Sequence, residues 1–429
     1  MMCALTLGLW LPVSASSAQQ RTVDRPAGDT LSLTRRQAIL LALRANPQID
    51  VAREQLSQAR AQRVQAVALA DPVLAGSADS ISSFRRITNA PQRPIALTGA
   101  IPFPDKLRLR GRIGSAAVDV AGASLTQLQQ QLAANAGRLY DSVMVVHLQQ
   151  RTLLDSRELS VEFLKRTQAR FNAGTVAKLD VIKAQVDLAQ AENDLIASRR
   201  DVTNADAALN RAIGRVTGTA IVASDSLGVP VGLPPLDAVE ASALASRPEL
   251  AAIQAQQRGA QAASTLVREN AFLPDFTLGA GRDLAASAGL TYAVGFSVPI
   301  PLLFWQHTRG DFAETHHREL ELAATLRDAR AAVAQDVRTT YATAEAALRQ
   351  VVFLRDQLLP SAREAYRIST VSYTLGGLSA LEVLDARRQL LSAQRQYADA
   401  LAAVNSTRSD LERAAGAALT SFPAGANRE

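Results

Sequence analysis

The chain has 429 residues, with 46 Lys and Arg against 40 Asp and Glu and a formal net charge of +6. Its single cysteine, Cys3, excludes a disulfide framework and a cysteine-rich zinc site. The modest charge, without a long basic block, disfavours nucleic-acid binding. Only 4% of the residues are aromatic, whereas 48% are hydrophobic, which is typical of long helices that pack through small side chains.

Residues 1–18 are predicted to be a signal peptide. An apolar run at residues 3–13 is followed by small residues that end at Ala18, as in a secretory leader and its cleavage site. Beyond residue 20 no apolar stretch is long enough for a transmembrane helix. We therefore expect an exported chain that is either soluble or part of a membrane β-barrel.

The rest of the chain contains one unit twice. The motif from Phe171 to Gly174 returns as the motif from Tyr373 to Gly376, and the residues that follow each glycine match at the same offset of 202. Self-similarity at a fixed offset indicates a tandem duplication. We predict a first repeat at 19–225, a linker at 226–235, a second repeat at 236–419 and a C-terminal tail at 420–429.

Each repeat is predicted to contain one β-hairpin, at about 73–101 and at about 275–298. In the second hairpin Tyr292, Val294 and Phe296 alternate with small or polar residues, which is the period of a strand with one apolar face. Aromatic residues concentrate around both hairpins, as in the girdles at bilayer interfaces. These three residues are therefore candidates to face lipid; the alternative is the core of a small β-domain.

Four strands per chain cannot close a membrane barrel, because small membrane barrels have at least about eight. Open strand edges are not tolerated in lipid. If the hairpins lie in a membrane, several chains must share one barrel.

Very long helices are predicted after each hairpin. No proline occurs from Asp105 to Val229, and proline is the residue that most strongly interrupts a helix. We expect helices at about 115–172 and about 176–213. In the second of these, large apolar and small residues alternate at heptad positions, which indicates a coiled coil. The large positions are Val181, Leu188, Leu195, Val202 and Leu209, and the small ones are Ala184, Ala191, Ser198, Ala205 and Ala212.

Gly174 and Gly376 are predicted to form the turns between the two long helices of each repeat. Just after the second turn, Glu382 and Asp385 are three residues apart and so share one helix face. In a threefold assembly their carboxylates would converge on one axis, and acidic rings favour cations. The alternative is an ordinary solvated charge pair.

This order of elements, repeated twice, resembles the TolC family of outer-membrane efflux channels. The most specific motifs are Arg170-Phe171 with Gly174 before Leu179-Asp180-Val181, and Tyr373 with Gly376 before the run from Leu381 to Ala386. The resemblance implies a mainly α fold with a small β part. Tandem-duplicated coiled-coil helices would form an α-helical tunnel, and two hairpins per chain would contribute four strands to a barrel shared by a homotrimer.

The resemblance also implies the roles of the tip residues. Glu382 and Asp385 would form the acidic ring of the channel entrance, and Tyr373 would bond Asp180 in the closed gate. One position departs from the family pattern, because Leu378 stands where an arginine is common.

The implied function is a passive exit duct from periplasm to exterior for small molecules or metal ions, in the outer membrane and extending into the periplasm. It would contact outer-membrane lipid, a periplasmic adaptor and an inner-membrane transporter, and would use no cofactor and no nucleic acid. An outer-membrane duct for type I protein secretion and an exported soluble coiled-coil scaffold are the alternatives. No hydrolase, P-loop or zinc-protease motif occurs, so we expect no enzyme and no metal site.

Overall fold

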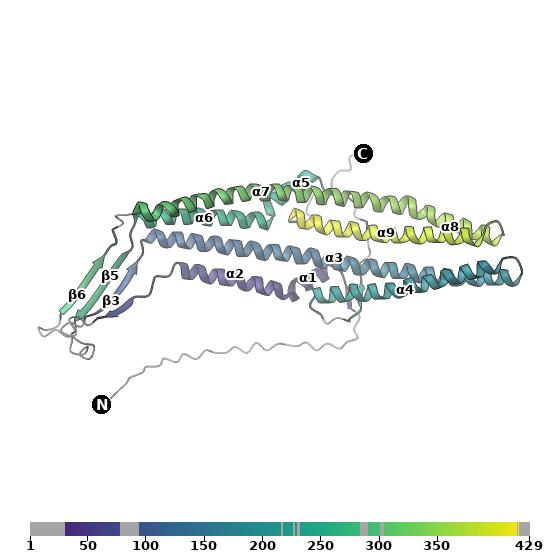
Figure 1. Cartoon of the computed structure of the whole chain (residues 1–429), viewed down its shortest axis with the longest axis horizontal. Helices are drawn as coiled ribbons and strands as arrows, with labels where there is room; N and C mark the ends of the chain where they lie inside the picture. Colours follow the sequence, from purple (N-terminus) through teal and green to yellow (C-terminus); the bar gives the residue numbers. More distant parts are fainter. Residues whose placement is uncertain are drawn as a thin grey trace, which may run out of the picture.

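The computed structural model describes residues 31–77, 94–215, 218–225, 228–229, 232–283, 291–300, 304–417 and 419. The predicted signal peptide, part of the predicted linker and the predicted C-terminal tail lie outside these residues. The molecule is elongated (Figure 1). A β-sheet lies at one end, and the turns that contain Gly174 and Gly376 lie at the other. Within the described residues, no helix has both the length and the apolar character needed to cross a bilayer.

Four antiparallel strands form the sheet at one end of the molecule (Figure 1). Their spatial order is β2 (Val73–Gly76), β3 (Pro94–Ile101), β5 (Phe276–Asp283) and β6 (Thr291–Ser297). Both predicted hairpins are confirmed by the pairing of β2 with β3 and of β5 with β6. Pairing of β3 with β5 joins the two hairpins into one sheet, and this the sequence did not predict.

The helices of the first repeat are α1 (Arg35–Ala45), α2 (Pro47–Ala66), α3 (Pro104–Asn172) and α4 (Lys178–Ala212). Helix α3 has 69 residues and is therefore about 104 Å long at about 1.5 Å per residue. The predicted start near residue 115 is wrong, because the helix begins at Pro104. Proline is well suited to the first helical turn, where its missing N–H would have no partner anyway.

The second repeat contains α5 (Leu236–Ser246), α6 (Pro248–Phe272), α7 (Phe304–Phe353), α8 (Leu359–Thr374) and α9 (Ala380–Ala415). A π-helical turn, η2 (Leu354–Leu358), separates α7 from α8 just before Pro360. Proline cannot donate to the carbonyl of Asp356, and its ring would crowd that carbonyl in a regular helix. The wider turn accommodates it, whereas the proline-free α3 continues without a break.

A second, two-stranded sheet pairs β1 (Leu31–Leu33) with β4 (Ile221–Ala223) in parallel. These strands were not predicted, because three residues are too few to show a period of two. They position Leu33 and Ile221 in a core cluster with Tyr140 and Leu209. The sheet thereby fastens both ends of the first repeat to the middle of α3.

The long helices pack through the predicted heptad seams. Helix α3 contacts α2, α4, α6 and α9, and α9 also contacts α7 and α8. Large and small heptad residues of α9 are buried together, which confirms the pattern that the second repeat shares with the first. They are Val383, Ala386, Leu390, Ala393, Ala400, Val404, Leu411 and Ala414.

Candidate functional site

The two predicted tip turns lie together at the end of the molecule opposite the four-stranded sheet (Figure 1). Gly174 and Gly376 have φ angles of 73° and 83°, in the left-handed region that glycine adopts without a Cβ clash. At each turn a backbone N–H bonds the carbonyl five residues earlier, Thr175 to Arg170 and Gly377 to Ser372. Helices commonly end in this way, so each glycine terminates its long helix and reverses the chain.

Tyr373 joins the two tips to each other. Its side chain is 3% exposed, and its ring packs against Phe163 at 5.5 Å between centroids. The guanidinium of Arg170 lies 4.5 Å from the Tyr373 ring centroid and donates to the Tyr373 carbonyl. The Tyr373 hydroxyl lies 3.3 Å from Thr167 Oγ1. The tyrosine of the second tip is therefore held by α3, the helix that leads into the first tip.

The implied bond between Tyr373 and Asp180 stays a prediction. Within the chain, Asp180 Oδ1 lies 3.9 Å from Lys183 Nζ on the same helix, while the Tyr373 hydroxyl is engaged by Thr167. A gate made from this pair requires either a rearrangement of the tip or an Asp180 from another copy of the chain.

Glu382 and Asp385 lie on the exposed face of the first turns of α9. Glu382 closes a capping box with Ser379: its Oε2 accepts from the Ser379 backbone N–H at 2.7 Å, and its own N–H donates to Ser379 Oγ. The hydrogen bonds from the Ser379 backbone and side chain lower the pKa of Glu382. Asp385 accepts from Gln389 Nε2 at 2.9 Å. Both carboxylates are available to a channel entrance, although the acidic ring itself stays a prediction.

A buried arginine that the sequence analysis missed ties α9 to α3 and α4 near the tips. Arg387 is 6% exposed, donates to Asp187 Oδ2 on α4, and donates to Ser156 Oγ on α3 at 2.8 Å. Farther along, Arg395 donates to Asp194 at 2.6 Å. Charged residues commonly flank a heptad seam. Only the three-dimensional packing therefore distinguishes the buried pair of Arg387 and Asp187 from the more exposed pair of Arg395 and Asp194.

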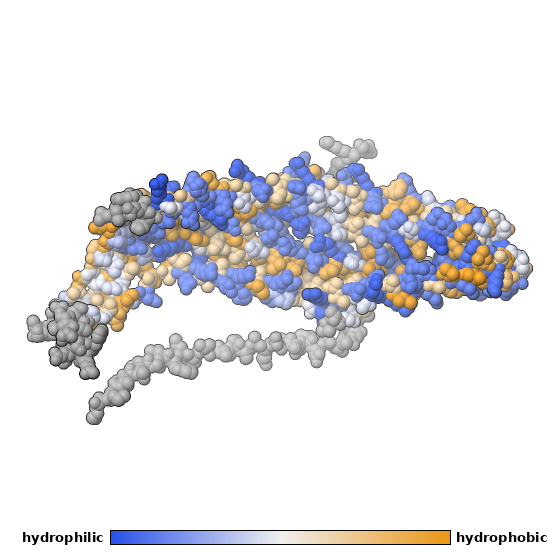
Figure 2. Space-filling model, viewed as in Figure 1, coloured by the Kyte–Doolittle hydropathy of each residue, from blue (hydrophilic) through white to orange (hydrophobic). Residues whose placement is uncertain are grey.

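One face of the four-stranded sheet is mostly apolar, although it also carries the exposed Arg282 between Ile95 and Tyr292, and the other face carries small residues. Leu74 pairs with Leu97, Leu97 pairs with Ala280, and Ala280 pairs with Val294. These residues therefore form one row across the four strands. Tyr292 and Phe296 are on the same face as Val294, as predicted, and Figure 2 shows hydrophobic residues along this end. Tyr292 is 70% exposed, Phe296 is 63% exposed and Val294 is 88% exposed, so the chain alone leaves this apolar face uncovered.

The opposite face of the sheet is nearly free of large side chains. It carries Thr98, Gly279, Gly281, Ala293 and Gly295, which line a hollow of about 270 Å³. A Cβ at Gly281 would lie 2.9 Å from the Ile95 carbonyl oxygen, so the close approach of β5 to β3 requires glycine there. This face therefore carries small side chains with few polar groups and leaves space for water, as in the lumen of a membrane barrel.

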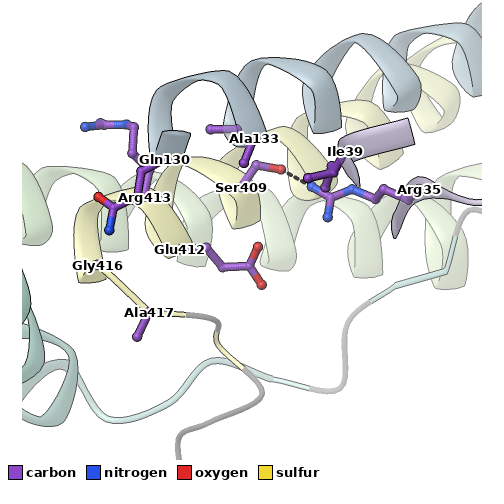
Figure 3. Close-up of a pocket in the computed structure, with 10 residues that line it drawn as sticks. Arg35, Ile39, Gln130, Ala133, Ser409, Glu412, Arg413, Gly416 and Ala417 are labelled. Atoms are coloured by element: carbon purple, nitrogen blue, oxygen red, sulfur yellow. Dashed lines mark hydrogen bonds between the residues drawn. The ribbon is translucent and has the colours of Figure 1, made fainter. Parts of the chain in front are cut away.

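A cavity of about 220 Å³ lies between α1, α3 and α9 in the middle of the molecule (Figure 3). The charged side chains on its wall are paired with other groups of the protein. Arg35 Nε donates to the buried Asp141 at 3.2 Å, and its Nη2 donates to Ser409. Burial raises the pKa of Asp141, and Arg35 opposes that effect. Glu412 and Arg413 on the cavity wall have ionic partners of their own. In the described part of the chain, no three His, Cys, Asp or Glu residues gather as a metal site.

The model of the outer membrane efflux protein family matches residues 38–215 and 240–417. The chain belongs to this family. This efflux protein is 23% identical over 394 residues, covering 90% of each chain, to the cobalt-zinc-cadmium resistance protein CzcC of Cupriavidus metallidurans. In fold it is similar to the outer-membrane channel OprN, with a TM-score of 0.74, 18% identity and 90% coverage of each chain. It is also similar to the Campylobacter jejuni outer membrane channel CmeC, with a TM-score of 0.74, 15% identity, and 89% and 85% coverage.

This efflux protein is therefore a channel component of the outer membrane that extends into the periplasm. Its long helices and its four-stranded sheet match these solved channels in fold.

Proposed function

We propose that this efflux protein assembles as a homotrimer into a passive exit duct, with its sheet in the outer membrane and its tips at the periplasmic entrance. The observation that carries the proposal is the sheet itself. Its apolar face is exposed, and its outer strands β2 and β6 each have one edge that pairs with no other strand in the described part of the chain. In lipid every backbone polar group needs a partner, so the β2 edge of one copy pairs with the β6 edge of the next.

The helical part supports the same arrangement. Near the tips α9 contacts α8, α3 and α4, and α3 also contacts α4, so α8 and α4 flank the pair of α9 and α3 in each copy. Both carry exposed apolar side chains: Leu179, Ile182 and Val186 on α4, and Ile368 and Val371 on α8. Packing α4 of one copy against α8 of the next covers the α4 side chains and Ile368 and closes the tunnel wall.

The periplasmic adaptor binds near the tips in this proposal. A groove of about 290 Å³ lies between α3 and α8. Its floor includes Phe163, Tyr366 and Tyr373, and its rim includes Glu162 and Arg166. Aromatic anchors inside a charged rim are typical of protein interfaces. The adaptor links the duct to an inner-membrane transporter, which supplies the energy, since the duct is not an enzyme.

The cargo that we propose is divalent metal cations. The relative CzcC is named for resistance to cobalt, zinc and cadmium, and the exposed Glu382 and Asp385 at the tips would favour cations. Small organic molecules and secreted proteins are the competing cargoes. In a host that lacks its own duct, expression with the cognate adaptor and transporter should lower cellular cobalt, zinc and cadmium; protection only against organic drugs would reject the metal assignment.

Disulfide cross-linking tests the assembly. In a Cys3→Ser background, Leu74→Cys on β2 is combined in turn with Tyr292→Cys, Val294→Cys and Phe296→Cys on β6. These positions share one sheet face, so at least one pair should oxidise between copies and give a trimer on a non-reducing gel. Leu97→Cys with Val294→Cys is the control, since β5 separates these strands within the chain. Release of the protein from membranes without detergent, or only monomer from all pairs, would favour the soluble scaffold.

A further inference from the structure

The junction between the sheet and the helices is a narrow layer. Strand β3 ends at Ile101 and α3 begins at Pro104, while α6 ends at Phe272 and β5 begins at Phe276 (Figure 1). With the sheet in the outer membrane, as proposed above, this layer lies at the headgroups of the periplasmic leaflet. The first two turns of α3 are within about 12 Å of the strand end, at about 1.5 Å per residue.

Two acidic groups beside the start of α3, Asp275 and Glu269, are engaged by other groups of the protein. Asp275 Oδ1 lies 2.7 Å from Nζ of Lys106, whose side chain is 3% exposed. Glu269 lies against Asp105; burial, together with a hydrogen bond and repulsion from Asp105, raises the pKa of Glu269. At the start of α3, Lys106 is therefore a buried structural cation, whereas Arg108 and Arg112 are exposed.

The arginines of this layer lack comparable partners. Arg108 is 3.8 Å from Asp105, with 68% of its side chain exposed, and such a loose surface pair contributes little. Arg112, one turn farther along the same exposed face, has no carboxylate partner in the described part of the chain. Arg112 therefore has no ionic partner among the described residues, and Arg108 has only the loose contact with Asp105, so both guanidinium groups can bind an external anion.

Helix α2 brings a further exposed arginine to the same layer. Gly114 of α3 packs against Arg63, since a Cβ at Gly114 would lie 3.0 Å from Arg63 Cα. Next to Arg63, the apolar side chains of Val64 and Leu69 are 71% and 59% exposed. Exposed apolar groups beside arginines are typical of a surface at the boundary between headgroups and acyl chains, where the arginine stem lies on apolar surface and its head reaches a phosphate.

We propose that Arg63, Arg108 and Arg112 form a basic belt that binds the phosphate groups of anionic phospholipids in the periplasmic leaflet of the outer membrane. Arg108 and Arg112 are four residues apart on one face of α3, so their like charges repel each other, and a lipid phosphate removes that repulsion. A guanidinium also matches a phosphate with two parallel hydrogen bonds. The belt would fix the depth of the channel in the bilayer, because it lies immediately below the apolar face of the sheet.

Lipid retention by the purified full-length protein tests the belt. Protein in neutral detergent is mixed with dioleoylphosphatidylglycerol or with dioleoylphosphatidylcholine, and bound lipid is measured by native mass spectrometry. A surface arginine contributes about fivefold to the binding of an anionic surface, so Arg108→Gln/Arg112→Gln should weaken phosphatidylglycerol retention about 25-fold. Arg108→Lys/Arg112→Lys should retain most of the binding, and salt should weaken binding by the wild type.

The matched control is Arg363→Gln/Arg367→Gln, an exposed pair with the same spacing on α8 near the tips. It should retain phosphatidylglycerol like the wild type. Equal retention by the Arg108/Arg112 variant and the wild type would overturn the belt. So would a change of ion selectivity without a change of lipid retention, because the arginines would then line the lumen. The cross-linked trimer is scored in the same samples, so failure of the belt and failure of the proposed duct are separate results.

Discussion

Tyr140 and Tyr341 are equivalent residues of the two repeats, and each makes the same hydrogen bond. The Tyr140 hydroxyl donates to the Leu33 carbonyl at 2.8 Å, and the Tyr341 hydroxyl donates to the Pro234 carbonyl at 2.9 Å. Both pairs are separated by 107 residues. The duplication has therefore kept a contact between each long helix and the residues just before α1 and α5.

Tyr140→Phe should make the stability of the protein less dependent on pH in alkali. Burial raises the pKa of Tyr140 from 10.0 to about 12. The folded state thus retains a proton that the unfolded state loses above pH 10, and the stabilisation present below that value is lost as pH rises toward 12. Urea unfolding across this range measures the effect. Tyr397→Phe is the control, and the same alkaline loss in Tyr140→Phe as in the wild type would contradict the assignment.

Glu382 and Asp385 should control the ion selectivity of the channel. Glu382→Gln/Asp385→Asn in planar bilayers should weaken cation selectivity and reduce block by divalent and trivalent cations. The fold should survive, because both side chains are exposed, although the loss of the charged capping group loosens the start of α9. Asp155→Asn/Glu158→Gln, an exposed pair with the same spacing on α3, is the control. Unchanged selectivity and block would place the constriction elsewhere.

Tyr373 should hold the tips closed. Tyr373→Phe removes the hydroxyl that lies near Thr167 and that would bond Asp180 in the implied gate, so single-channel conductance should rise. A conductance equal to that of the wild type would show that the ring contacts with Phe163 and Arg170 are sufficient for closure.

At the scale of elements, the α8–α9 seam should be sensitive to added volume. Ala393 is 3% exposed and packs in a cluster with Leu359, Ala362 and Leu390. Ala393→Leu should lower the free energy of unfolding by about 1–3 kcal/mol, because a close-packed seam has no room for the larger side chain. The adjacent, exposed Ser392→Leu adds a similar bulk outside the seam and should have little effect. Equal melting temperatures of the two variants would show that the seam is loosely packed.

The contact between α2 and α3 depends on glycine, the residue that has no side chain. A Cβ at Gly111 would lie 3.1 Å from Val67 Cγ1, closer than an ordinary van der Waals contact. Glycine at this position allows the backbones to approach each other. The same approach brings the end of α2, with its exposed arginine, to the junction with the sheet.

At the scale of the whole molecule, the exposed apolar stripe of α4 should be the surface that joins copies. Val186 is 60% exposed and lies on the same face as Ile182, four residues before it. Val186→Asp should therefore prevent or weaken trimer formation in detergent while leaving the helical content of each chain unchanged. Gln185→Asp places the same charge one position away, on another exposed site, and should assemble normally. Light scattering on the two purified variants distinguishes them, and a trimeric Val186→Asp would exclude α4 from the interface.

Much of this architecture follows from local patterns. Long helices follow each hairpin as expected, although α3 begins at Pro104 and not near residue 115, and Tyr292, Val294 and Phe296 share one face of the sheet. Helices and strands have different periods, and proline and glycine interrupt or reverse the chain through their own backbone restrictions. Such features depend on neighbours within a few residues, so the sequence by itself determined them.

The contacts between distant segments were decided only by the tertiary structure. Lys106 and Asp275 are 169 residues apart, and Arg387 and Asp187 are 200 residues apart. Their charges are indistinguishable in the sequence from the solvated charges around them, because burial depends on which helices pack together. The pairing of β3 with β5 and of β1 with β4 was likewise hidden, since backbone hydrogen bonds between strands carry no side-chain pattern that names the partner.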